Sequence, residues 1–269
     1  MKRFFLISLV AASSALAADE PPQKIDVKAL PAQATLVDNV VVPVPSEVFG
    51  VLDKLGKPHW EQVLRNTKEQ ARVIGEPPQI ALQFGTVIAE GFIAVEAENP
   101  EEVKKIGGSV SKLAKALGVE KHVEKHANAI IKSAEQKDWP NVRHELDLTL
   151  RDVKQAMQDI NSDALSQLVS LGGWLRGTEA LTVVVGKAFT KDGAELLHQP
   201  LLLDYFEKRL ANMPLKIKKD PLIGAVQKGV LEIRPLVGLD DGTQISEKSL
   251  KEVGEVTGRL VKAINTKSN

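Results

Sequence analysis

The chain has 269 residues, its 35 Lys and Arg are balanced by 35 Asp and Glu, it has no cysteine, and only 4% of its residues are aromatic. The balanced charge excludes the strongly basic footprint of a nucleic-acid-binding protein, and the lack of cysteine excludes disulfides, thiolate nucleophiles and cysteine-bound metals. A chain of this length can bury a core, which must consist mainly of Leu, Ile, Val and Ala.

The first 17 residues have the layout of a secretory signal peptide. Lys2 and Arg3 precede an apolar run over residues 4–12, and small residues then lead to "ALA" at 15–17, an A-x-A cleavage pattern. The apolar run is much shorter than the roughly 20 residues that a membrane-spanning helix needs. We therefore expect cleavage after Ala17, export to the periplasm or the extracellular space, and no transmembrane span in the mature chain.

Residues 18–45 predict a Pro-rich extended arm or linker. Prolines recur along this segment and disfavour a helix, because each lacks a backbone donor. The segment 34–45, "ATLVDNVVVPVP", is the only strand-like run of the chain, and its prolines would confine it to a sheet edge. Such an arm could also add to a partner protein as an extended segment.

Residues 46–269 predict an all-α domain, a multi-helix bundle or helical array of about ten helices. Polar caps and first-turn prolines mark the helix starts, and glycines mark several ends. One expected helix, 59–75, opens after Pro58 and stops at Gly75. The starts lie at or next to Ser46, Pro58, Pro77, Asn99, Val119, Pro140, Ser162, Asp192, Pro200, Asp220 and Ser246.

Two segments about 80 residues apart are alike, which raises the question of an internal repeat. Each has a tryptophan near a helix start, Trp60 or Trp139, and a Gly-containing apolar helix behind it. The identities are few, so two helical halves, 46–137 and 138–213, with a C-terminal helical cap, 214–269, are one option beside a single domain.

Glycines four residues apart predict close helix packing. Gly173 and Gly177 would share one face of a helix, as would Gly254 and Gly258, and a neighbouring backbone could approach each pair closely. The alternative is that these glycines are merely tolerated within their helices.

The stretch "GVEKHVEKHANAI" at 118–130 places His122 and His126 four residues apart, so both could hold one metal ion on a helix. Glu124 lies on another side of this helix and does not match the zinc-protease order H-E-x-x-H. Neighbouring lysines would also repel a cation. The two interpretations are a weak surface metal site and two solvated histidines at the edge of an apolar face.

Charged residues also stand where the helical pattern favours apolar ones. Arg176 and Glu179 fall on the apolar face of the helix expected after Ser162, provided that Gly172-Gly173 does not kink it, and Glu90 lies in an apolar helix. We expect Glu90, Arg176 and Glu179 to meet between two buried helices. The site would bind a ligand or carry acid/base chemistry, or it would be an ion pair that only fixes helix register.

No catalytic or cofactor motif is present: the chain lacks a phosphate-binding loop, a dinucleotide fingerprint, a serine elbow and a haem-attachment motif. We therefore expect no cofactor and no nucleic-acid partner. The leading hypothesis is an exported, bacterial-type helical protein that acts as a binding or scaffolding module in the cell envelope, with an envelope protein or a small molecule as its partner. The alternative is a metal-dependent or carboxylate-based enzyme with a site between buried helices. The oligomeric state is left open.

Overall fold

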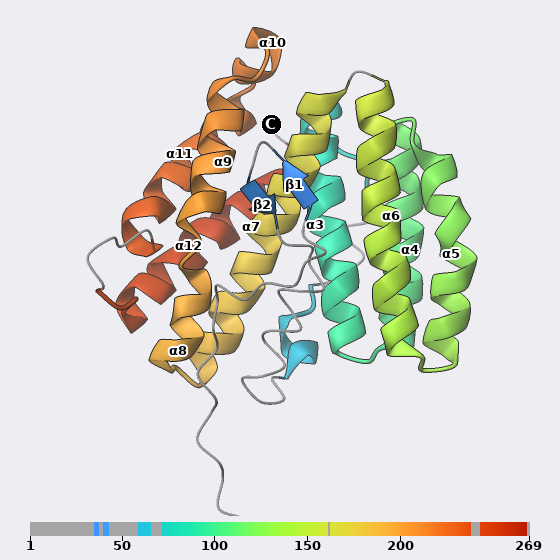
Figure 1. Ribbon diagram of the computed structural model, residues 1–269, viewed down its shortest axis with the longest axis horizontal. Coiled ribbons are helices and arrows are strands. Elements are labelled where there is room, and N and C mark those ends of the chain that lie inside the picture. Colours follow the sequence, from blue (N-terminus) through green and yellow to red (C-terminus); the bar gives the residue numbers. More distant parts are fainter. Residues whose placement is uncertain are drawn as a thin grey trace, which may run out of the picture.

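A computed structural model describes residues 35–37, 40–42, 59–65, 72–160, 162–237 and 243–267. The described chain is an all-α helical array, as the sequence predicts (Figure 1). The expected signal peptide, most of the Pro-rich arm and the helix expected after Ser46 lie outside these residues.

Helix α3 (Pro77–Glu96) is the centre of the fold. Two prolines form its first turn, and nearly every side chain after them is buried. It packs most extensively against α7 (Asp163–Lys187) and then against α4 (Pro100–Ala116). Among the described helices, α3 alone is long and apolar enough to cross a membrane, but 94% of its apolar window is buried inside the protein, which is the burial of a core helix.

Helices α4, α5 (Glu120–Glu135) and α6 (Trp139–Asp159) form a layer on one side of α3, at the right of Figure 1. Each packs against the next in the sequence, and α6 returns to contact α3 and α7. The cap expected at Asn99 is confirmed, because its side chain accepts a hydrogen bond from the backbone N–H of Glu102 at 3.1 Å.

The C-terminal helices lie on the opposite side, at the left of Figure 1. These helices and the short turns between them are α8 (Lys191–Ala194), η3 (Glu195–Leu197), α9 (Pro200–Ala211), α10 (Leu215–Lys218), α11 (Pro221–Val237) and α12 (Glu247–Ile264). Helix α12 packs against both α7 and α11, and α11 also packs against α9, so α7 joins the two sides of the molecule.

The strand-like run in the arm forms a small antiparallel pair of strands, β1 (Thr35–Val37) and β2 (Val40–Val42). Thr35 lies opposite Val42 in this pair. Strand β2 lies next to α9.

The prediction of one continuous helix over 59–75 is wrong. Among the described residues of this range, 59–65 and 72–75, only η2 (Trp60–Val63) is helical, and it is a single 3-10 turn, after which Leu64 is extended with φ −59° and ψ 133°. The backbone groups of Val63 and Arg65 pair with charged side chains of α3 and α7, as described below, and are therefore not available for a continuous helix.

Glycines allow helices α3 and α7 to approach each other closely. A Cβ atom added at Gly85 would lie 2.0 Å from the carbonyl oxygen of Val169, and one added at Gly172 would lie 2.1 Å from that of Leu82. Any side chain at either position would therefore push the two backbones apart.

The glycine pairs singled out in the sequence are only partly at close contacts. A Cβ at Gly254 would lie 2.9 Å from the hydroxyl of Thr182, but one at Gly177 would meet nothing within 4 Å. The close approach on α7 thus lies at Gly172 and Gly173, because a Cβ atom added at Gly85 would lie 2.7 Å from the backbone nitrogen of Gly173. The proposed internal duplication stays a prediction, although Trp60 begins a 3-10 turn and Trp139 a long α-helix.

Candidate functional site

A polar stripe runs along the buried helix α3. We use this name for Gln79, Gln83, Thr86 and Glu90, which are four, three and four residues apart and so share one face of the helix. None of the four is more than 7% exposed. Because buried polar groups need hydrogen-bond partners, the stripe determines which segments pack over it.

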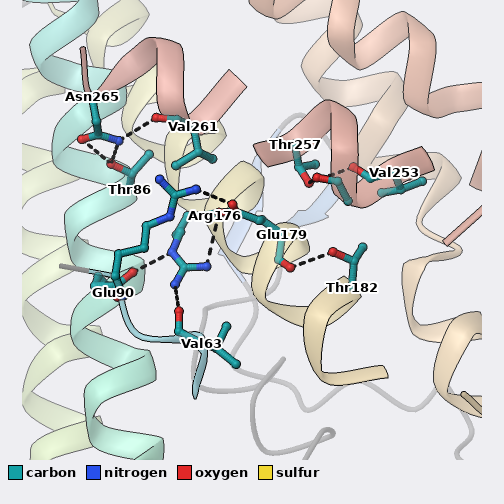
Figure 2. A network of polar contacts seen from close by, with 12 residues as sticks. Val63, Thr86, Glu90, Arg176, Glu179, Thr182, Val253, Thr257, Val261 and Asn265 are labelled. Atoms are coloured by element: carbon teal, nitrogen blue, oxygen red, sulfur yellow. Dashed lines mark hydrogen bonds and ion pairs between the residues drawn. The ribbon is translucent and has the colours of Figure 1, made fainter. Parts of the chain in front are cut away.

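The C-terminal end of α12 is hydrogen-bonded to this stripe. The Nε2 atom of Gln79 donates to the carbonyl oxygens of Ile264 at 3.1 Å and Thr266 at 3.0 Å. Asn265 Nδ2 lies 3.3 Å from the hydroxyl of Thr86 (Figure 2). The two contacts of Gln79 use backbone carbonyls at the end of the helix and just beyond it, where no partner within the helix is available.

A second segment, just before α3, is held by Gln83. Its Nε2 atom donates to the carbonyl oxygen of Arg72 at 2.7 Å, and its Oε1 atom accepts from the backbone N–H of Ile74 at 3.4 Å. The side chain of Gln83 therefore fixes the chain as it approaches α3.

The fourth residue of the stripe belongs to a charged ring, which consists of Arg65, Glu90, Arg176 and Glu179. Arg176 donates from Nε to Glu90 at 2.6 Å and from Nη1 to Glu179 at 3.3 Å. Arg65 closes the ring, because its guanidinium donates to Glu179 and its backbone N–H to Glu90. Arg176 also donates to the carbonyl oxygen of Val63 at 2.6 Å (Figure 2).

The ring is balanced in charge and is largely buried. Glu90 and Arg176 are 0% and 1% exposed, whereas the side chains of Arg65 and Glu179 are 29% and 14% exposed. Charged side chains are rarely buried unless they are paired, and here each carboxylate has a guanidinium partner. Arg65 and Glu179 thus form the side of the ring that solvent can reach.

The structure brings Glu90, Arg176 and Glu179 together, as the sequence analysis expects. Helix α7 is continuous through Gly172-Gly173, so Arg176 keeps the inward direction of the apolar face. Arg65 was missed because residues 59–75 were expected to be helical. The available signal was the excess of carboxylates: two glutamates and one arginine form a buried cluster that needs a second cation.

The two histidines have different surroundings. His122 is exposed, as expected for a solvated side chain, but His126 is only 6% exposed. On the side facing α6, His126 Nδ1 lies 2.7 Å from Glu145 and Nε2 lies 3.2 Å from Asp152. The prediction that both are solvated is therefore wrong for His126, because α6 packs on that edge of α5.

Asp152 also receives a hydrogen bond from Lys125, at 2.9 Å. This bond, with a further contribution from His126, holds the pKa of Asp152 below its ordinary value, against the opposing effect of burial. The described residues hold no group of three or more His, Asp or Glu side chains that could bind a metal ion. His122 and His126 are thus joined by no third ligand in that part of the chain.

A cavity of about 1300 Å³ lies beside the charged ring and is bounded by the segments that the polar stripe fixes. Arg65 belongs to both the ring and the cavity wall. The cavity is lined by Arg65, Arg72, Val73, Ile74, Gly75, Gly258, Lys262, Asn265, Thr266 and Lys267.

Comparisons of the chain with protein-family models, with curated proteins and with solved structures find no match. The functional interpretation therefore depends on the geometry of the charged ring and of the cavity next to it.

Proposed function

We propose that the protein is an exported binding or scaffolding module of the cell envelope, which holds a small molecule or a segment of a partner protein in the cavity beside the charged ring. The observation that carries the proposal is the construction of this cavity. Its walls are fastened to buried polar side chains of the central helix, at Gln79, Gln83 and Thr86. Walls that are fixed before a ligand arrives reduce the entropy lost on binding.

The charged ring favours binding over acid/base catalysis. A general acid or base must reach its substrate and must exchange a proton near the working pH. Glu90 is 0% exposed, and Arg176 and the backbone N–H of Arg65 occupy its two oxygens. A carboxylate held in this way is inaccessible to a substrate, so the ring supports a role in positioning Arg65 at the cavity wall.

The export part of the proposal is supported by the sequence of residues 1–17, which has the three regions of a signal peptide. N-terminal sequencing of the protein recovered from the envelope and the medium of its native cells tests it. We expect the mature chain to start at Ala18. A protein that keeps Lys2 and Arg3 and stays inside the cell would overturn this part.

The binding part is tested by native mass spectrometry of the protein purified from its own cells. We expect a bound molecule or a co-purifying partner on the wild type, weakened or lost in Thr266→Trp, in which an indole would occupy part of the cavity at its wall. Asn128→Trp, on the exposed side of α5, is the matched control and should keep the bound species. Turnover of a substrate that one side-chain change abolishes would instead favour the enzyme alternative.

A further inference from the structure

The described lining of the cavity is positively charged, whereas the chain as a whole has equal numbers of positive and negative residues. Of its ten lining residues in the part of the chain that the structure describes, four are cationic, Arg65, Arg72, Lys262 and Lys267, and none is Asp or Glu. The complete sequence has 35 residues of each sign, so an average surface would present both. A concave surface lined by one sign of charge concentrates ions of the opposite sign.

The charged ring already neutralises one of these four cations. Arg65 donates to Glu179, and the ring as a whole has two positive and two negative groups. Arg72, Lys262 and Lys267 remain, all three are exposed, and none pairs with a carboxylate of the described chain. The described lining of the cavity therefore has an excess of three positive charges.

These three cations stand on, or directly next to, backbone that is held in place. The carbonyl of Arg72 accepts from Gln83, and Lys262 lies in the last turn of α12, whose next residues pair with the polar stripe. Lys267 follows directly on Thr266, whose carbonyl accepts from Gln79. Since their backbones are fixed, the side chains can converge on a ligand with less loss of entropy.

We infer that this cavity binds a small molecule that carries two or more negative charges on phosphate or carboxylate groups. The inference rests on the proposed binding function and names its ligand class. Arginine and lysine form their strongest hydrogen bonds with such anions. The volume, about 1300 Å³, exceeds the roughly 300–1000 Å³ typical of small-molecule sites, so the cavity has room for an organic anion with its water.

Isothermal titration calorimetry with pyrophosphate and with citrate tests this inference, with phosphatidylglycerol vesicles as a third arm. We expect saturable binding of a soluble anion to the wild type, weakened by added salt. The double variant Arg72→Gln/Lys262→Gln should weaken it about tenfold or more, because both exposed cations are lost. Lys248→Gln, whose side chain is 86% exposed on the first turn of α12, is the matched control and should bind as the wild type does.

Binding that is equal in the double variant and the wild type would overturn the inference, as would the absence of saturable binding to all three probes. Binding to the vesicles alone would overturn the assignment to a soluble small molecule. A neutral or cationic molecule found on the natively purified protein would keep the proposed binding function and reject only its anionic ligand class. If no bound species of any charge is found there, the proposed function itself fails.

Discussion

Arg176 and Glu90 form a salt bridge of 2.6 Å in the interior, with side chains that are 2% and 0% exposed. This pair joins α7 to α3 near the centre of the fold, and it also determines the path of residues 63–65, whose backbone groups complete the hydrogen bonding of both side chains. The residues at the centre of the candidate site are thus also residues on which stability depends.

Arg176→Met is expected to lower the free energy of unfolding by about 3–5 kcal/mol, because it leaves the buried Glu90 without its guanidinium partner. Urea denaturation followed by circular dichroism measures this change. The double variant Glu90→Leu/Arg176→Met should recover part of the loss, since it removes both charges. A single variant as stable as the wild type would contradict the buried ring.

Gly85→Ala is expected to destabilise the protein by about 3 kcal/mol, because the new methyl group meets the carbonyl oxygen of Val169 and must separate α3 from α7. Gly177→Ala on α7 is the matched control. A Cβ there has no neighbour within 4 Å, so the higher helix propensity of alanine should raise stability by about 1 kcal/mol. A lower melting temperature for Gly85→Ala and a higher one for Gly177→Ala would support this arrangement, and equal changes in the two variants would contradict it.

Local signals predicted most of the helices. The prolines before α3 and the cap at Asn99 act within a few residues, so the sequence alone reveals them. The failure at residues 59–75 has a different cause. Arg65 reaches Glu90, 25 residues away, and Glu179, 114 residues away, and the helix does not continue through the described residues 64 and 65. Helical periodicity contains no information about such partners.

In the candidate site, too, local sequence patterns predicted some features, whereas features that depend on long-range packing could not be predicted. The apolar pattern was enough to bring Glu90, Arg176 and Glu179 to one place, because burial on two helices leaves charged side chains few partners. The pairing of His126 with Glu145 and Asp152 could not be predicted, since it depends on which edge of α5 contacts α6. The cavity was missed for a similar reason, because its described walls come from two distant parts of the chain, residues 65 and 72–75 on one side and residues 258–267 on the other.

Asp152→Asn is expected to lower stability at pH 7 by about 1 kcal/mol, because it loses the charged partner of Lys125 and His126. The pKa of Asp152 is lower in the folded protein than in the unfolded chain. The carboxylate therefore stabilises the fold fully above its unfolded pKa, about 4, and this contribution is lost as the pH falls through the lower folded pKa.

The difference between wild type and Asp152→Asn should accordingly shrink in acid, as measured by urea denaturation from pH 7 to pH 3. Glu124→Gln, on the exposed face of the helix that holds His126, is the control and should differ little from the wild type at any pH. A difference for Asp152→Asn that stays constant over this range would contradict the assigned ion pair.

Lys154, on α6, is half-buried, and desolvation lowers its pKa to about 8. The unfolded chain binds this proton more tightly than the folded protein does, so the stability of the wild type should rise as the pH increases from about 8 to about 10.5.

Lys154→Met removes the cost of holding a desolvated charge and should raise the free energy of unfolding at pH 7 by about 1–3 kcal/mol. This gain should decrease towards pH 10.5, whereas the exposed control Lys248→Met should change stability little at either pH. Denaturation curves at both pH values test the prediction, and a Lys154→Met variant less stable than the wild type at pH 7 would show that the ammonium group has a stabilising partner.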